Sequence, residues 1–158
     1  MKKIKLVVFF LAVAFCSKAQ SCLYNNIDSN YKVKFVCKGG IQLNGKIDDT
    51  SSVQIKSIDS NIVITGRIDH NSKVILEARN GNVTIGDKID AGSNIQIICK
   101  GDILIQGKID GDAICDFYTE TGKIIVMDKV GGNNTIIRYH SVQTPDWGKS
   151  KSIIPVAY

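Results

Sequence analysis

The sequence predicts an all-β fold: a right-handed parallel β-helix, or β-solenoid, of about five coils with a repeat of about 21 residues. The first reason is a phrase, Ile103-Leu-Ile-Gln-Gly-Lys-Ile-Asp110, that returns at residues 41–48, 62–69 and 83–90 and, in decayed form, at 124–131. The second is its period, because the Ile-Asp steps at 47, 68, 89 and 109 and the Val at 130 lie 21, 21, 20 and 21 residues apart. The third is the alternation of apolar residues within each phrase, which is typical of strands with one buried face.

Length and composition fit one domain of ordinary size. The chain has 158 residues, of which 44% are hydrophobic and 22% charged. Its net charge of +5 is spread along the chain rather than gathered in one block. A basic stripe with interleaved aromatic residues is missing, so we expect no nucleic-acid partner.

Residues 1–19 are predicted to be a cleaved signal peptide. Three early lysines precede an apolar run at 6–15 that is too short to span a bilayer, and Ser17 and Ala19 supply small residues before the cut. We therefore expect an exported protein (periplasmic, outer-surface or secreted) with no integral membrane segment after cleavage. Lipoprotein processing at Cys16 is the less favoured alternative, because the preceding residue is a bulky phenylalanine. The end of this segment resembles signal peptides of Bacteroidetes.

Residues 20–39 are expected to form a polar N-terminal cap, followed by half a coil from residue 31. Cleavage leaves four cysteines, of which Cys37 and Cys99 occupy one column three coils apart. At ~4.8 Å per coil their separation is about 14 Å, beyond the ~7 Å limit for a disulfide. Small buried hydrophobic roles are therefore favoured for these cysteines. Cys22 with Cys37 is the one pair left to test.

Residues 40–140 are expected to hold the repeats, with β-branched side chains stacked inside. The inward columns of the first strands are Ile41, Ile62, Val83, Ile103 and Ile124, then Leu43, Ile64, Ile85, Ile105 and Val126. Each coil then has a turn of small polar residues and a second strand, such as the one with inward Val53 and Ile55.

Two columns of opposite charge are expected to run side by side on the outside. The cationic column is Lys46, Arg67, Lys88, Lys108 and Lys129, and the acidic column is Asp48, Asp69, Asp90 and Asp110. A functional interpretation makes them a stripe for a polyanion or a row of cation sites. We favour a mutually neutralising, solvated face, because exposed ion pairs give little lasting field.

Catalytic motifs do not appear in the sequence. The chain has two histidines, His70 in a turn and His140 at the end of the last coil, and lacks a nucleophile elbow, a P-loop or a zinc-protease motif. Polysaccharide lyases resemble the chain in architecture only, since they carry long loops over a groove. We therefore expect no enzyme activity, no cofactor and no metal site.

The candidate binding surface is a set of outward apolar residues near the C-terminal end. Leu104 and Ile125 belong to the first strands, and the second strands contribute Ile75, Ile98, Tyr118, Ile137 and Tyr139. Residues 141–158 break the repeat and are expected to be an irregular C-terminal cap over the last coil and part of this surface. The alternative is that the surface stays open for a partner.

The phrase Ile-x-Ile-x-Gly-Lys-Ile-Asp, with Gly81-Asn-Val-Thr-Ile-Gly86, resembles the repeats of exported bacterial β-solenoids of the head-GIN adhesin type, and more distantly those of bactofilins. The first resemblance implies a non-enzymatic surface or periplasmic binding protein, and the second implies end-to-end filaments. A signal peptide departs from the cytoplasmic bactofilin pattern. Neither family supplies catalytic residues.

Three functions follow as hypotheses. The first is a binding or adhesion module with a protein or glycan partner at the cell surface or in the periplasm. The second is a self-assembling structural scaffold. The third is an exported inhibitor or immunity-type protein that blocks a protein partner through its apolar face.

Overall fold

The structure, a computed structural model, describes residues 20–150 and 155–158. The predicted signal peptide and the lipoprotein site at Cys16 lie outside the described residues. Within them the chain forms strands, turns and bends, and no helix is long and apolar enough to cross a membrane.

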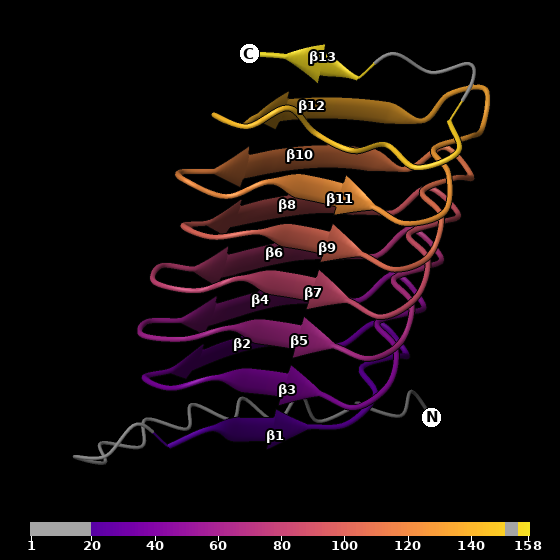
Figure 1. Cartoon of the computed structure of the whole chain (residues 1–158). Helices are drawn as coiled ribbons and strands as arrows, with labels where there is room; N and C mark the ends of the chain where they lie inside the picture. The colour runs from indigo at the N-terminus through magenta and orange to yellow at the C-terminus, as the bar shows by residue number, and fades with distance from the viewer. Residues whose placement is uncertain (1–19, 151–154) are drawn as a thin grey trace, which may run out of the picture.

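Two sheets, each built of parallel strands, face one another along the molecule (Figure 1). The six-stranded sheet is made of β1 (Cys22–Tyr24), β3 (Ile41–Leu43), β5 (Ile62–Ile64), β7 (Val83–Ile85), β9 (Ile103–Ile105) and β11 (Ile124–Val126). The seven-stranded sheet is made of β2 (Lys32–Cys37), β4 (Ser52–Ser57), β6 (Lys73–Ala78), β8 (Asn94–Cys99), β10 (Ile114–Thr119), β12 (Ile136–His140) and β13 (Val156–Ala157). From β1 to β12, consecutive strands along the chain belong to opposite sheets, so each strand pairs with its counterpart in the next coil; β13 returns to the sheet of β12.

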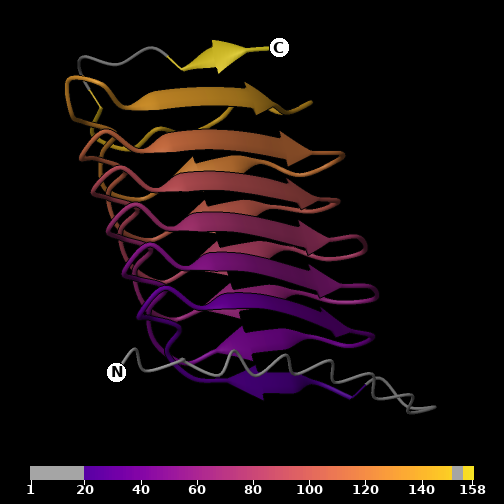
Figure 2. The same ribbon diagram turned by 180° about the vertical axis from the view of Figure 1, so that it is seen from behind.

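The coils wind with the predicted right hand. In Figure 1 the front strands point right while those behind point left as the chain climbs, and the view from behind in Figure 2 agrees. The described chain makes about six turns rather than the five expected. The difference arises at residues 20–39, which complete a coil of their own because Cys22 pairs with Ile41 and Ile27 bridges Ile47.

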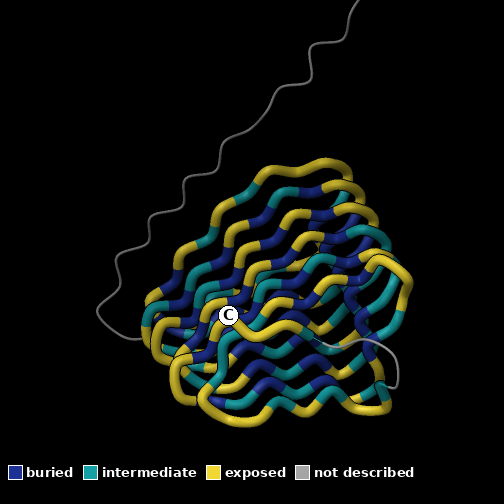
Figure 3. Tube along the Cα trace, turned by 90° about the horizontal axis from the view of Figure 1, so that it is seen from above, coloured by how far each residue is buried: buried dark blue, intermediate teal, exposed yellow. Residues whose placement is uncertain are grey.

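Inward side chains form the expected columns. Ile41 pairs with Ile62, and Ile62 pairs with Val83. Figure 3 shows buried positions alternating with intermediate or exposed ones along the middle coils. Ile62, Ile64 and their neighbours in the middle coils are completely buried. Each such side chain contributes roughly 1.5–3 kcal/mol, so stability comes from the stack and not from any single coil.

The four cysteines within the described residues form one disulfide and two buried thiols. Cys22 and Cys37 are joined, which ties β1 to β2 inside the first coil. Cys37 and Cys99 do occupy one column, through Ser57 and Ala78. Cys99 and Cys115 are free and buried, as expected for small hydrophobic residues.

The C-terminal residues continue the winding beyond β11. Asp146 bridges to Ile125 in the six-stranded sheet, and β13 pairs with β12 in the other. Trp147 packs edge-on against Tyr139, with ring centroids 5.3 Å apart. The tail therefore covers the last full coil.

Candidate functional site

The most distinctive outward surface lies on β8, β10 and β12. Ile98, Tyr118 and His140 are neighbours in register across these three strands. The Tyr118 and His140 rings are stacked, with centroids 4.8 Å apart and planes 10° from parallel. Ile98 and Tyr118 are each 37% exposed, so adjacent strands present large apolar side chains to solvent side by side.

A polar column runs beside this apolar one. Gln96, Asp116 and Arg138 are in register, and Ile75 precedes them on β6. Arg138 donates two hydrogen bonds to the Asp116 carboxylate, at 2.5 and 2.8 Å. This contact pairs the two side chains and raises the pKa of Arg138.

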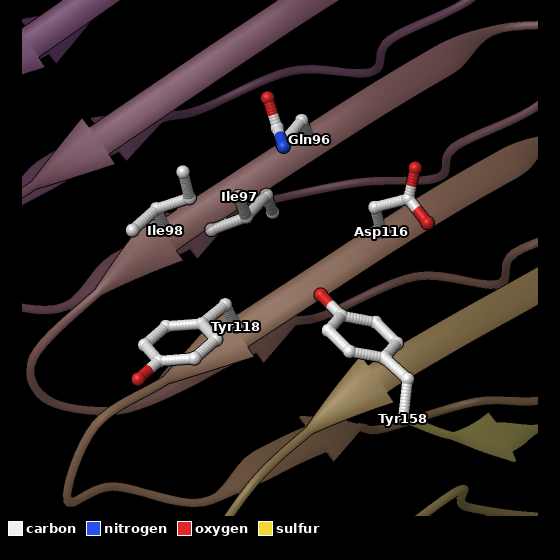
Figure 4. A pocket seen from close by; sticks show the side chains of 6 residues that line it. All are labelled: Gln96, Ile97, Ile98, Asp116, Tyr118 and Tyr158. Carbon is white, nitrogen blue, oxygen red and sulfur yellow. The ribbon is translucent and has the colours of Figure 1, made fainter.

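Tyr158 extends across both columns from the tail. Its backbone N–H donates to the carbonyl of Tyr139 at 3.0 Å, which holds the end of the chain against β12. Its side chain lines a depression together with Gln96, Ile97, Ile98, Asp116 and Tyr118. Figure 4 shows the Tyr158 phenol oxygen pointing toward the middle of these residues. Partial burial and the nearby Asp116 carboxylate raise the pKa of Tyr158.

These residues together form one surface, which we call the Tyr118 face. It consists of Ile75, Gln96, Ile98, Asp116, Tyr118, His140 and Tyr158.

The structure brings together only part of the predicted binding surface. Ile75, Ile98 and Tyr118 point outward on the seven-stranded sheet. Leu104 and Ile125 are outward and half-buried on the six-stranded sheet, which forms the opposite side of the molecule (Figures 1 and 2). These two residues therefore belong to a different surface.

The outward placement of Ile137 and Tyr139 is wrong. Ile137 is 2% exposed and pairs with the inward Cys115, while Tyr139 pairs with the inward Phe117. The register from Ile114 to Ile136 spans 22 residues, one more than the usual period, and a shift by one residue exchanges the two faces of a strand. The extra residue lies in the turn Gly131-Gly-Asn-Asn134. The length of this turn was the feature of the sequence that indicates the change of register.

His140 and Arg138 occupy the outward positions instead, and sequence reasoning missed both. Once the register is corrected, the same alternation places them beside Tyr118 and Asp116. The C-terminal Tyr158 carried no such signal, because it lies beyond the last repeat.

No family model, curated protein or solved structure matches this chain. Its candidate sites are therefore judged on their own geometry.

The acidic column is not solvated as expected, since Asp48 and Asp69 are 1% and 3% exposed. Each aspartate begins a turn. The Asp48 carboxylate accepts the backbone N–H of Asp49 at 2.8 Å, and its carbonyl accepts the Ser51 hydroxyl at 2.6 Å. Asp69 and Asp90 make the same two kinds of contact in their coils. Side chains of this type close tight turns, so Asp48, Asp69 and Asp90 have a structural role in their coils.

The cations bind these aspartates within a coil and between coils. Lys46 lies 2.6 Å from Asp48, and Arg67 bridges Asp48 at 3.5 Å and Asp69 at 3.1 Å. Lys88 bridges Asp69 and Asp90 in the same way. The ladder continues through Lys108 and Asp110, whereas Lys129 is exposed and is followed two residues on by Gly131 in place of an aspartate.

The Asp48 and Asp90 carboxylates stay ionised although both are shielded from solvent. Burial alone would raise the pKa of Asp48, but hydrogen bonds from Lys46, the Asp49 N–H and His70 hold that pKa well below its usual range. The pKa of Asp90 is lowered against the same effect of burial by Lys88 and the Ala91 N–H. The ladder is thus internally neutralised and does not offer a free charged stripe.

One cluster has the donor types of a metal site. Ligand atoms of Asp48, Asp49 and His70 lie within 4.8 Å of one another. However, His70 Nδ1 already contacts one oxygen of Asp48 at 2.5 Å, while Lys46 and Arg67 contact the other. The positive charges of Lys46 and Arg67 on the same carboxylate would repel a metal ion, so the arrangement fits an ion-pair network better than a metal centre.

Proposed function

We propose that this protein is an exported, non-enzymatic binding or adhesion module that contacts its partner through the Tyr118 face. The observation that carries the proposal is the Ile98–Tyr118–His140 column, which leaves apolar and aromatic side chains open to solvent on a flat sheet. Contiguous apolar patches exposed on a protein surface often mark interaction sites, and tyrosine is enriched among the residues that contribute most of the binding energy. The partner is a protein or a glycan at the cell surface or in the periplasm.

Rigidity of the face supports this function. Tyr118 is stacked on His140, and Asp116 is held by two hydrogen bonds from Arg138. Side chains fixed before binding lose little conformational entropy when a ligand arrives. The paired Asp116 and Arg138 also offer polar contacts beside the apolar column. Because they neutralise each other, a bound ligand would not bury an unpaired charge.

The disulfide supports the proposed compartment. A bond between Cys22 and Cys37 is stable in the periplasm or outside the cell, whereas reducing systems in the cytosol keep thiols free.

The proposal is tested by measuring binding of the purified protein to arrays of bacterial surface glycans and of exported proteins. Tyr118→Asp is compared with Met127→Asp, which changes an exposed apolar residue just after β11, on the opposite side of the molecule. We expect the Tyr118 variant to lose at least about tenfold in affinity, as a central aromatic contact does, and the Met127 variant to retain binding. Equal binding by both variants would place the interaction elsewhere.

A further inference from the structure

The first coil presents unpaired strand edges. β1 and β2 stand at the ends of their sheets, and no other described strand pairs with their outer edges. The backbone carbonyls of Tyr31 and Cys37 accept hydrogen bonds from the backbone N–H groups of Ser52 and Ile58 in the second coil. Because the backbone groups of a strand alternate in direction, those of Lys32, Lys34 and Val36 point away from the molecule. This edge is ready to pair with another strand.

Apolar side chains at the same end are incompletely covered. Tyr24 and Phe35 are stacked with ring centroids 3.8 Å apart, and both are only half-buried. Their counterparts one coil later, Leu43 and Ile55, are at most 1% exposed. Leu23, Tyr31 and Val36 around them are 66%, 59% and 48% exposed.

The opposite end differs. Ile137, in the last long strand, is 2% exposed, and Trp147 packs beside it on Tyr139. The outermost strand, β13, has two residues and follows Pro155. Short edges next to proline are poor templates for further pairing. The described part of the molecule therefore ends in a long strand edge at the first coil and in a two-residue edge, beside the exposed Val156 and Tyr158, at the other end.

We propose that the first coil is a self-association surface that pairs with the first coil of a second copy of this chain. A twofold axis perpendicular to the sheets reverses each strand and keeps it in its own sheet. β1 then meets its own copy, β2 meets its own copy, and both pairs are antiparallel. Because only the first coil of the described residues presents a long strand edge, assembly closes at a dimer and does not propagate into filaments.

The size of this interface predicts its strength. A strand of six residues is about 20 Å long, and two packed sheets with their outer side chains are also about 20–25 Å thick, so each copy covers roughly 500 Å². The total of about 1,000 Å² lies at the lower limit for specific association, so we expect a weak and reversible dimer and look for it at micromolar concentration and above. In the antiparallel β2 pair, the exposed Lys32 and Lys34 of the two copies lie near one another and repel, so salt should strengthen the dimer.

The test uses the full-length chain, expressed and purified with its N-terminus recorded by mass spectrometry. Light scattering and sedimentation velocity are measured across micromolar concentrations at low and high salt. Lys34→Pro removes an outward N–H from the edge and places a ring there, whereas Lys34→Ala removes the charge and keeps the N–H. We expect a concentration-dependent dimer for wild type, an equal or tighter dimer for Lys34→Ala, and a monomer for Lys34→Pro with an unchanged circular dichroism spectrum.

A monomer at every concentration, or mass that rises past a dimer, would overturn the proposal, as would a dimer that persists in a folded Lys34→Pro protein. Hydrogen exchange provides a second measurement that does not depend on the variant. Amides of residues 32–36 in wild type should become protected as concentration rises, while those of 114–119 in β10 should not change. Exchange at 32–36 that is independent of concentration would contradict pairing at this edge.

Discussion

Replacing Asp48 by asparagine tests whether the buried ladder stabilises the fold. The variant keeps an oxygen that can accept the Asp49 N–H but removes the charge that Lys46 and Arg67 contact at 2.6 and 3.5 Å. Breaking a fully buried ion pair costs about 3–5 kcal/mol. Lys46 and Arg67 are 35% and 38% exposed, so water screens and hydrates them when the charge is lost. We therefore expect a loss of about 2 kcal/mol at neutral pH.

The loss should depend on pH with a definite sign. The pKa of Asp48 is depressed in the folded protein, so its charge stabilises the fold fully above the unfolded pKa of about 3.9. That contribution disappears as pH falls toward the folded pKa, because the wild-type carboxylate then becomes protonated. The difference between wild type and Asp48→Asn should thus be full at pH 7 and shrink below about pH 4.

Thermal and urea unfolding of both proteins across this pH range measure the effect. For a domain of this size, a loss of about 2 kcal/mol lowers Tm by about 4–8 °C. Asp49→Asn is the matched control, since Asp49 is adjacent and exposed and should change stability by less than about 0.5 kcal/mol. A loss below about 0.5 kcal/mol in Asp48→Asn, or one equal at pH 3 and pH 7, would refute the assigned role.

Three further predictions concern packing and the cysteines. Ile64→Ala should lower the free energy of unfolding by about 2–5 kcal/mol and Ile75→Ala by less than about 0.5 kcal/mol, and equal losses in urea titrations would contradict their placement. Reducing the Cys22–Cys37 bond, which joins residues 15 apart, should cost about 3 kcal/mol, so unchanged melting in a phosphine reductant would be inconsistent with the bond. Burial raises the pKa of Cys99 to about 12, so iodoacetamide should label it only in denaturant, and rapid labelling of the native protein would show that it is accessible.

Stacked columns were predictable from the sequence because the repeat itself fixes the register. Ile41, Ile62 and Val83 begin the same phrase, and the structure pairs them one above another. The first coil could not be recognised this way, because Cys22-Leu-Tyr24 shares the alternation of the phrase but not its residues. A single unit that departs from the repeat then resembles a polar cap.

The predictions that failed, for the acidic column and for β12, both depend on the conformation or length of a turn. The alternation rule applies within a strand, and Asp48 lies where the strand has already ended. Asp49 and Thr50 follow with positive φ angles of 52° and 56°, which turn the Asp48 side chain back onto the backbone instead of outward. At β12 the sequence left open which residues face inward, because Ile136 and Ile137 are both apolar. The length of the preceding turn decides it, and the structure pairs Ile137 with the inward Cys115.

Stacking of the coils also determines how the molecule responds to tension. The strands lie across the long axis, so a pull on the two ends peels one hydrogen-bonded strand after another rather than shearing a whole sheet (Figure 1). Releasing one coil of about 21 residues lengthens the chain by roughly 70 Å. The Cys22–Cys37 bond keeps most of the first coil from extending. An anchored molecule of this kind would lengthen in equal steps under load while its remaining coils stay folded.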